Sequence, residues 1–169
     1  ARASHQSRER KLEILKDSHT GAFAIICCGL YLIVFFAAWC EVSAAGRAAL
    51  ALCLGPVLSR GLSGLFAVTL PNARGTGLLA TFTAPMDAAR ARAVLGTWTA
   101  AAAAPMAALS PGAGGGVLAG AALACVYYVA TAKRQFGGVT GDLAGFFLQL
   151  CELGMVLGAV VAQRIEVLV

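Results

Sequence analysis

Residues 20–40, TGAFAIICCGLYLIVFFAAWC, decide the fold class of this chain. The stretch contains no Asp, Glu, Lys or Arg. About 20 apolar residues are the length that an α-helix needs to cross the hydrocarbon core of a bilayer. Trp39 lies near one end of the stretch, where aromatic side chains favour the membrane surface. The stretch therefore predicts a membrane-spanning helix.

The composition of the whole chain agrees with a membrane location. Of its 169 residues, 59% are hydrophobic and only 12% are charged, and the mean hydropathy is +0.80. These values exclude a soluble globular domain, because such a domain needs a larger charged surface. The six cysteines lie in apolar runs without a C-x-x-C spacing, which argues against a disulfide framework or a zinc site. The net charge of +5 comes from residues that separate apolar segments, so nucleic-acid binding is not predicted.

Four further apolar stretches follow the first, and they lie approximately at residues 48–70, 93–109, 117–132 and 143–162. The third contains Pro105, which can kink a membrane helix. Residues 110–116, SPGAGGG, predict a tight turn between the third and fourth stretches.

The expected fold is all-α, a polytopic transmembrane helical bundle with about five spans. A single membrane domain would occupy residues 1–169. Within it we expect an amphipathic cytoplasmic segment over residues 1–19, five transmembrane helices over residues 20–162, and a tail over residues 163–169.

The distribution of basic residues predicts the orientation of this bundle. If five helices alternate in direction, ten of the 13 Lys and Arg residues lie on one side and two on the other, and Arg60 lies inside the second span. The positive-inside rule then places the first residues, the second loop and the fourth loop in the cytoplasm. We expect a multi-pass protein of the inner or plasma membrane. The chain begins at Ala1 without a signal-peptide pattern, which we interpret as a start within a longer protein.

Three polar segments are expected at the cytoplasmic face: SRERKLEILKDS, PNARGTG and KRQFGGVTGD. They carry two aspartates, Asp17 and Asp142. A Mg²⁺ ion takes one or two protein carboxylates and completes its shell with water and phosphate oxygens. Cationic side chains would supply the positive charge that a diphosphate substrate requires. The candidates are Lys16, Arg60, Arg74 and Arg134.

Structural alternatives stand beside these candidates. Asp17 and Asp142 would also suit helix N-termini as caps, and residues 137–141, GGVTG, are either a plain turn or an anion-binding nest. Arg60 lies within a span, where an arginine costs at least about 2.5 to 3.5 kcal/mol unless it faces protein or water. It either pairs with Glu152 of the fifth span or serves a function.

Glycine pairs four residues apart are expected to form helix-packing faces. The pairs are Gly116 with Gly120 and Gly154 with Gly158.

Several motifs resemble cobalamin synthase, the adenosylcobinamide-GDP ribazoletransferase family. Residues 7–21, SRERKLEILKDSHTG, resemble the family segment R-x-x-x-L-E-I-[ML]-[KR]-D-S-x-x-G. Residues 136–145, FGGVTGDLAG, resemble its G-G-x-T-G-D-x-x-G signature. Two looser matches lie between these segments: Ser59-Arg60 is similar to the family's S-R element, and residues 73–75 are similar to its A-R-x-x-G element. Glu152 stands in place of a family glutamate.

The resemblance implies an integral membrane, Mg²⁺-dependent transferase of vitamin B12 biosynthesis. Such an enzyme transfers the cobinamide phosphate of adenosylcobinamide-GDP to α-ribazole, or to its 5′-phosphate, and releases GMP. The resemblance implies that Asp17 and Asp142 are catalytic residues and metal ligands. The implied substrate-binding residues are Lys16, Ser18, Arg60, Arg74, Arg134, Gly138, Thr140 and Gly141.

The sequence departs from the family pattern in one major respect. The acidic motif H-L-D-G-L-A-D-T-x-D-G, which would precede Ala1, is absent, so this chain by itself is expected to be inactive. Association of the chain into a homo-oligomer is left as an open alternative. The competing interpretation is a non-enzymatic membrane protein, either a small transporter or a helical subunit of an assembly. A transporter would be expected to show internal repeats, which the five spans do not show.

Overall fold

The computed structural model of the chain describes residues 6–17, 19, 21–43, 46–75, 77–83, 85–109 and 111–168. The described residues form α-helices and one π-helical segment, without a β-strand, which confirms the all-α prediction. In chain order the elements are α1 (Arg8–Ile14), α2 (Ala22–Cys40), α3 (Arg47–Cys53), α4 (Gly55–Thr69), α5 (Leu78–Thr83), α6 (Ala88–Leu109), α7 (Pro111–Thr131), η1 (Ala132–Phe136) and α8 (Gly141–Leu168).

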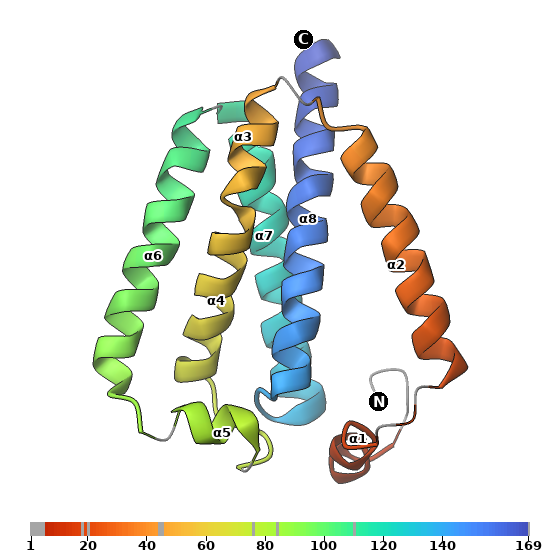
Figure 1. Cartoon of the computed structure of the whole chain (residues 1–169), viewed down its shortest axis with the longest axis vertical. Helices are drawn as coiled ribbons and strands as arrows, with labels where there is room; N and C mark the ends of the chain where they lie inside the picture. The colour runs from red at the N-terminus through yellow and green to blue at the C-terminus, as the bar shows by residue number, and fades with distance from the viewer. Residues whose placement is uncertain are drawn as a thin grey trace.

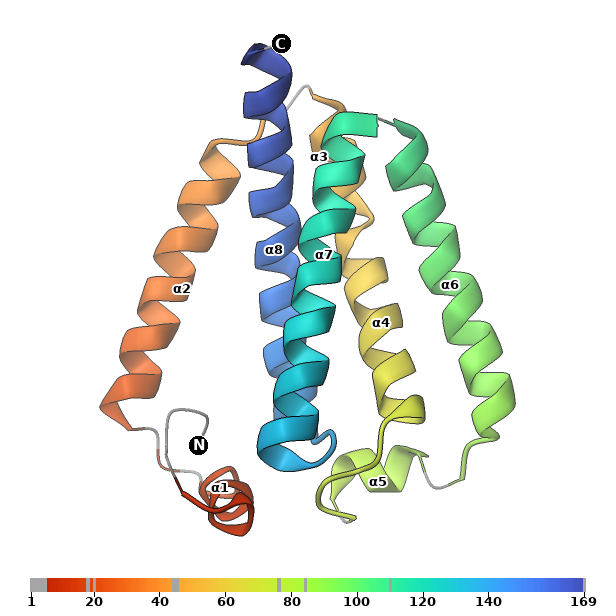
Figure 2. The same cartoon turned by 180° about the vertical axis from the view of Figure 1, so that it is seen from behind.

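The long helices run along one common direction (Figure 1). Helices α7 and α8 form the central pair, α4 and α6 pack on one side, and α2 leans away on the other (Figure 2). The short helices α1 and α5 lie at the end of the bundle that also holds η1 and the start of α8. We call this the lower end, and the end that holds the start of α3 and the end of α8 the upper end.

Several of these helices are suited to a bilayer. Among the described residues, three helical stretches are long and apolar enough to cross a membrane: α2, residues 112–136 and α8. Counting the bent pair α3 and α4 as one span gives a fourth. Helix α2 supports this assignment, because almost all of its surface is exposed and Phe23 is 83% accessible. The chain is therefore a multi-pass membrane protein by the length and hydropathy of its helices.

The second predicted span is not one continuous helix. Helices α3 and α4 meet at Leu54 with a bend of 40°. Pro56 lies in the first turn of α4. A proline has no backbone N–H and its ring clashes with the carbonyl four residues earlier, so it interrupts a helix that would otherwise continue.

The turn predicted at residues 110–116 is wrong for residues 111–116, because α7 already begins at Pro111, and Ser110 lies outside the described residues. Proline is favoured at the first helical position. The glycines that follow serve close helix contacts: a Cβ on Gly114 would overlap the Met106 carbonyl of α6, and one on Gly116 would overlap the Gly158 carbonyl of α8. Tertiary packing thus overrides the low helix propensity of glycine.

Two other helix boundaries also differ from the prediction. Helix α6 begins at Ala88 instead of near residue 93. Helix α8 continues to Leu168, so most of the predicted tail is helical.

The glycine pairs pack as predicted. On α7 and α8, Gly120 faces Gly154 so closely that a Cβ on Gly120 would overlap the Gly154 carbonyl oxygen. Small residues at such positions let two membrane helices approach closely.

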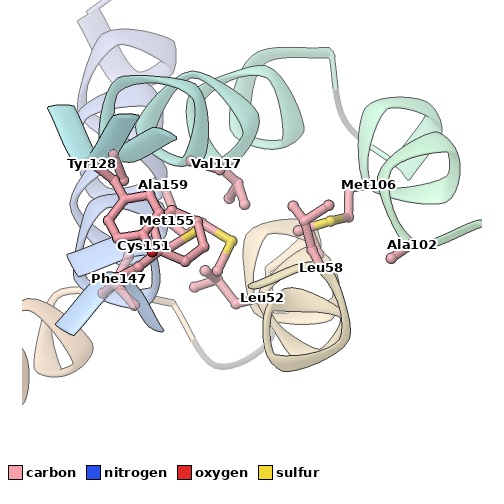
Figure 3. Close-up of a cluster of buried hydrophobic side chains, with 14 of the residues drawn as sticks. Leu52, Leu58, Ala102, Met106, Val117, Tyr128, Phe147, Cys151, Met155 and Ala159 are labelled. Atoms are coloured by element: carbon pink, nitrogen blue, oxygen red, sulfur yellow. The ribbon is translucent and has the colours of Figure 1, made fainter. Parts of the chain in front are cut away.

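A core of buried side chains joins four parts of the bundle (Figure 3). Met106 of α6, Val117 of α7 and Met155 of α8 are each at most 1% exposed. Toward the lower end, Phe66, Tyr128 and Phe147 form an aromatic cluster with ring centroids 4.9 to 5.3 Å apart. These contacts fix the lower ends of α4, α7 and α8 relative to one another, and the loops at those ends carry the polar motifs.

Candidate functional site

The polar segments expected at one face do lie at one end of the bundle. The lower end holds α1 with the loop that follows it, the connection from α4 to α5, and the connection from η1 to α8 (Figures 1 and 2). A groove of about 970 Å³ lies elsewhere, along α7 and α8. It is lined by apolar and small residues such as Gly116, Leu123, Leu150 and Val161, with Glu166 as the charged residue among the described lining. The charged site is therefore distinct from this groove.

Two of the motif segments are joined by a short parallel β-bridge between Asn72 and Val139. The Ala73 N–H donates to the Val139 carbonyl at 2.9 Å, and the Val139 N–H donates to the Pro71 carbonyl at 2.8 Å. A Cβ on Gly138 would overlap the Pro71 carbonyl oxygen and lie 2.9 Å from the Ala73 nitrogen. Position 138 therefore needs glycine so that the two loops can approach each other.

This bridge brings Arg74 to Asp142. Arg74 Nη2 lies 2.9 Å from Asp142 Oδ2, and the Arg74 side chain is 19% exposed whereas that of Asp142 is 51% exposed. Asn72 shapes the loop, because its Oδ1 accepts hydrogen bonds from the N–H groups of Arg74 (3.0 Å) and Gly75 (3.1 Å). The result is a charge-assisted pair whose carboxylate stays half accessible at the start of α8.

Thr140 begins α8 as its capping residue. Its Oγ1 accepts a hydrogen bond from the Leu143 N–H at 3.2 Å, and the residue is 2% exposed. The predicted contact between the Thr140 hydroxyl and substrate stays a prediction. Thr140 supplies the side-chain cap, whereas Asp142 lies in the first turn of α8, where its negative charge suits the helix dipole. Gly141 is exposed, and a Cβ there would meet nothing within 4 Å.

Asp17 lies in the loop between α1 and α2. Its Oδ1 accepts a hydrogen bond from the His19 N–H at 2.9 Å and lies 2.8 Å from His19 Nδ1. The backbone donor of His19, followed by its ring, lowers the pKa of the Asp17 carboxyl below its ordinary value. Helix α2 begins at Ala22 without a side-chain cap, so Asp17 closes a local turn and does not cap this helix. Asp17 is therefore a carboxylate at neutral pH, with 57% of its side chain exposed.

Two further predicted site residues, Lys16 and Ser18, are the chain neighbours of Asp17. Lys16 is exposed at the end of α1. Ser18 lies outside the described residues.

The two aspartates belong to the same end of the bundle, but no contact joins them in the described part of the chain. No cluster of three or more His, Cys, Asp and Glu residues that could hold a metal occurs among the described residues. Each aspartate already has a donor on one oxygen, Arg74 for Asp142 and His19 for Asp17. These residues fit Mg²⁺ only as single carboxylate ligands, with the rest of the shell from water and phosphate oxygens.

Arg60 does not join the lower-end site. Its Nη1 forms an ion pair with Glu152 Oε1 and also contacts the Ser59 hydroxyl at 3.1 Å. Ser59, which is fully buried, donates to the same carboxylate at 3.1 Å. Glu152 follows Asp142 by ten residues on α8, or about 15 Å along the helix. The structure thus shows the pairing alternative for Arg60, whose side chain is 57% exposed, whereas that of Glu152 is 20% exposed.

Two further cations lie at the lower end. Arg134 is exposed in η1, as expected for a residue facing solvent or headgroups. Arg8 of α1 contacts Gly137, because a Cβ on Gly137 would overlap the Arg8 guanidinium carbon. Arg8 was not among the predicted site residues, although it is the first residue of the R-x-x-x-L-E-I segment. Asn72 was missed as well, because its role depends on the loop conformation.

The fold and the site together define a class: an all-α multi-pass membrane protein with a carboxylate–guanidinium site at one end of its bundle. The chain belongs to the cobalamin-5-phosphate synthase family, whose profile matches residues 1–160. This finding confirms the family suggested by the sequence motifs.

Individual relatives agree with the family assignment. The chain is 37% identical to the adenosylcobinamide-GDP ribazoletransferase of Lachnoclostridium phytofermentans, over 96% of the chain and 62% of the relative. It is 36% identical to the enzyme of that name from Mesorhizobium japonicum, over 93% of the chain and 59% of the relative. The chain therefore spans about three fifths of the length of these relatives. No solved structure matches it significantly.

Proposed function

We propose that this chain serves the transfer of the cobinamide phosphate of adenosylcobinamide-GDP to α-ribazole, or to its 5′-phosphate, with release of GMP. This reaction belongs to the last steps of cobalamin biosynthesis. The family match and the names of the relatives support the proposal. The structural observation that carries it is the Arg74–Asp142 pair, which the loop bridge holds at the start of α8.

The chemistry of phosphoryl transfer suits such a site. The ribazole hydroxyl attacks the phosphorus on the cobinamide side, the bond from that phosphorus to the bridging oxygen of GMP breaks, and the hydroxyl proton leaves. The protein mainly positions the reactants and balances the charge on the phosphate oxygens. Arg74 donates from Nη2 to Asp142 and has further N–H groups for a phosphate oxygen. Asp142, which is half accessible, would accept the proton or hold a metal.

Mg²⁺ is part of the proposal as a cofactor. Asp142 and Asp17 would each give a carboxylate oxygen, and water and substrate phosphates would complete the shell. When bound, the ion would neutralise charge on the transferred phosphate. Lys16, Arg134 and the backbone of Thr140 and Gly141 are proposed to assist at the same end, with Ser18 as a further hydroxyl. The N–H groups of Gly138 and Val139 already donate to the carbonyls of Ala132 and Pro71.

We also propose five membrane spans, with α6 as the additional one. Helix α6 has 22 residues, or about 33 Å, which is enough for a hydrocarbon core of about 30 Å. Arg90 and Arg92 lie in its first turns at the lower end. Most of the described Lys and Arg residues lie at the lower end, whereas Arg60 lies within α4 and Arg47 and Arg164 lie at the upper end. The positive-inside rule then supports a cytoplasmic lower end in the inner or plasma membrane. Self-association of the chain stays a prediction.

The decisive experiment measures GMP release from adenosylcobinamide-GDP in membranes that contain the full-length protein, with α-ribazole and Mg²⁺ added. We expect GMP and the cobalamin product to form at equal rates. The Asp142→Asn variant should lose at least about 100-fold in rate, since asparagine keeps the shape but not the charge. Membrane expression should be unchanged, because Thr140 caps α8.

Asp87→Asn is the matched control. Asp87 lies at the same end and its Oδ1 accepts a hydrogen bond from the Ala89 N–H at 2.9 Å, a role that asparagine can keep. Its rate should stay within about 2-fold of wild type. A near wild-type rate in Asp142→Asn would refute the site assignment. A substrate-dependent flux without GMP release would support a transporter instead.

A further inference from the structure

Arg8 makes the closest contact between the N-terminal motif and the loop that precedes α8. Gly137 ends η1 with a φ of +69°. A Cβ at this position would overlap the guanidinium carbon and the terminal nitrogens of Arg8. Glycine is thus required at position 137 for two reasons: the backbone there is left-handed, and the Arg8 guanidinium fills the space that a Cβ would occupy. Helix α1 also contacts η1 itself.

The charge of Arg8 is not balanced by an ion pair within the described residues. The ion pairs there use Arg10, His19, Arg60, Arg74, Arg90 and Arg164, and none of them involves Arg8. The pKa of the neighbouring Glu9 carboxyl is lowered mainly by hydrogen bonds from the backbone and from Ser7. The charge of Arg8 contributes less to this shift. Arg8 is exposed, so its N–H donors are accessible to a ligand.

The position of Arg8 connects it to the proposed site. Gly137 lies two residues before Val139, which bridges to Asn72. Asn72 in turn holds the loop from which Arg74 reaches Asp142. Arg8 therefore contacts one of the two joined loops, at Gly137, and Arg74 belongs to the other.

We propose that Arg8 binds a phosphate oxygen of the diphosphate substrate, and that Gly137 is the positioning residue that allows its guanidinium group to approach. The choice of a diphosphate rests on the proposed function. A guanidinium group suits this task because it can bind a phosphate with two parallel hydrogen bonds.

A purely structural role for Arg8 makes different predictions. A cation beside the end of η1 would stabilise that helix end through its dipole, and lysine would serve nearly as well as arginine. Such a role would change stability and leave phosphate affinity unaltered.

The test uses the purified full-length protein and radiolabelled pyrophosphate as the probe, together with KM and kcat for adenosylcobinamide-GDP. Arg8→Gln should weaken pyrophosphate binding at least about 10-fold and raise KM by a similar factor. Arg8→Lys should fall between Arg8→Gln and wild type. Arg10→Gln is the matched control on the same helix, because Arg10 pairs with Glu13, and it should stay within about 2-fold of wild type.

Gly137→Ala tests the positioning role. It should weaken pyrophosphate binding to the level of Arg8→Gln, and the double variant should be no worse than either single variant, because both act through one contact. Gly77→Ala is the control for backbone strain: Gly77 has a φ of +97° and nothing within 4 Å of an added Cβ. If Gly137→Ala does not fold, the Arg8 variants decide the proposal.

Several results would overturn the inference. Wild-type pyrophosphate affinity in Arg8→Gln would do so, as would equal losses in Arg8→Gln and Arg10→Gln. A loss confined to binding of phosphatidylglycerol vesicles would identify a lipid phosphate as the ligand and contradict the proposal. If wild type binds pyrophosphate through Arg8 yet releases no GMP, the anion site stands and the proposed reaction fails.

Discussion

Two small residues in the loop before α8 control how the charged site is assembled. Gly138 lets the backbones of two loops touch, and Thr140 satisfies a buried N–H at the start of α8. Neither residue carries charge, but Arg74 and Asp142 meet only because these backbones are fixed. Both roles can be tested by single substitutions.

Gly138→Ala should open the loop bridge. The new Cβ would overlap the Pro71 carbonyl, so the hydrogen bonds between the loops must lengthen and Arg74 must move from Asp142. We expect a loss of about 1–3 kcal/mol in stability and a fall of at least about 10-fold in GMP release, measured by thermal unfolding in detergent and by the membrane assay.

Gly145→Ala is the control for Gly138→Ala. Gly145 is exposed on α8 and an added Cβ meets nothing within 4 Å. This variant should match wild type or gain up to about 1 kcal/mol from better helix propensity. Equal stability of the two variants would contradict the steric role of Gly138.

Thr140→Val should destabilise the start of α8. Valine has the shape of threonine but no acceptor for the buried Leu143 N–H. The expected cost is about 1–2 kcal/mol, and Thr140→Ser should recover most of it because serine can also cap a helix. Thermal unfolding of the two variants in one detergent checks this. Equal midpoints for the valine and serine variants would rule out the capping role.

At the scale of helices, α7 and α8 depend on glycine for their contact. Gly120 approaches Gly154, and Gly116 approaches Gly158, closely enough that each excludes a Cβ. Without a hydrophobic driving force between helices in lipid, such close packing supplies much of the association energy.

Gly120→Ala should therefore push α7 away from α8. We expect a loss of about 1–3 kcal/mol, because backbone atoms oppose the new methyl group and cannot rotate away. Gly115→Ala on the same helix meets nothing within 4 Å and should not lower stability. The measurement is the unfolding midpoint of both variants in the same detergent. A Gly120→Ala protein as stable as the Gly115→Ala protein would show that the close approach is not needed.

At the scale of the whole molecule, charge is distributed unequally between the two ends. Arg8, Arg74, Arg90 and Arg134 lie at the lower end, whereas Arg164 lies at the upper end in an ion pair with Glu41, the residue that follows α2. This asymmetry is the basis of the proposed orientation.

The orientation can be tested with a membrane-impermeant thiol reagent. In a variant whose native cysteines are replaced, Ser7→Cys and Asp87→Cys should react only from the cytoplasmic side, because both positions lie at the lower end. Ser43→Cys, in the connection between α2 and α3 at the upper end, should react only from the outside. Labelling of Ser7→Cys and Ser43→Cys from one side would disprove the proposed span number.

The sequence alone was sufficient to predict the class of the protein and to predict which charged segments share one end of the helical bundle. A bilayer requires long apolar helices, so composition and segment length were sufficient to predict the all-α membrane fold. The packing role of the glycine pairs of α7 and α8 could also be predicted, because their spacing is a local property of a helix. The family motifs likewise lie in short continuous segments.

Only the tertiary structure decided which partner each polar side chain has. Arg60 pairs with Glu152, 92 residues away, and Arg74 with Asp142, 68 residues away. Arg8 reaches Gly137 because α1 packs on η1, and residues 111–116 are helical because neighbouring helices need their small size. These outcomes depend on contacts between distant segments, and the energy of such contacts is not encoded in local propensity or spacing.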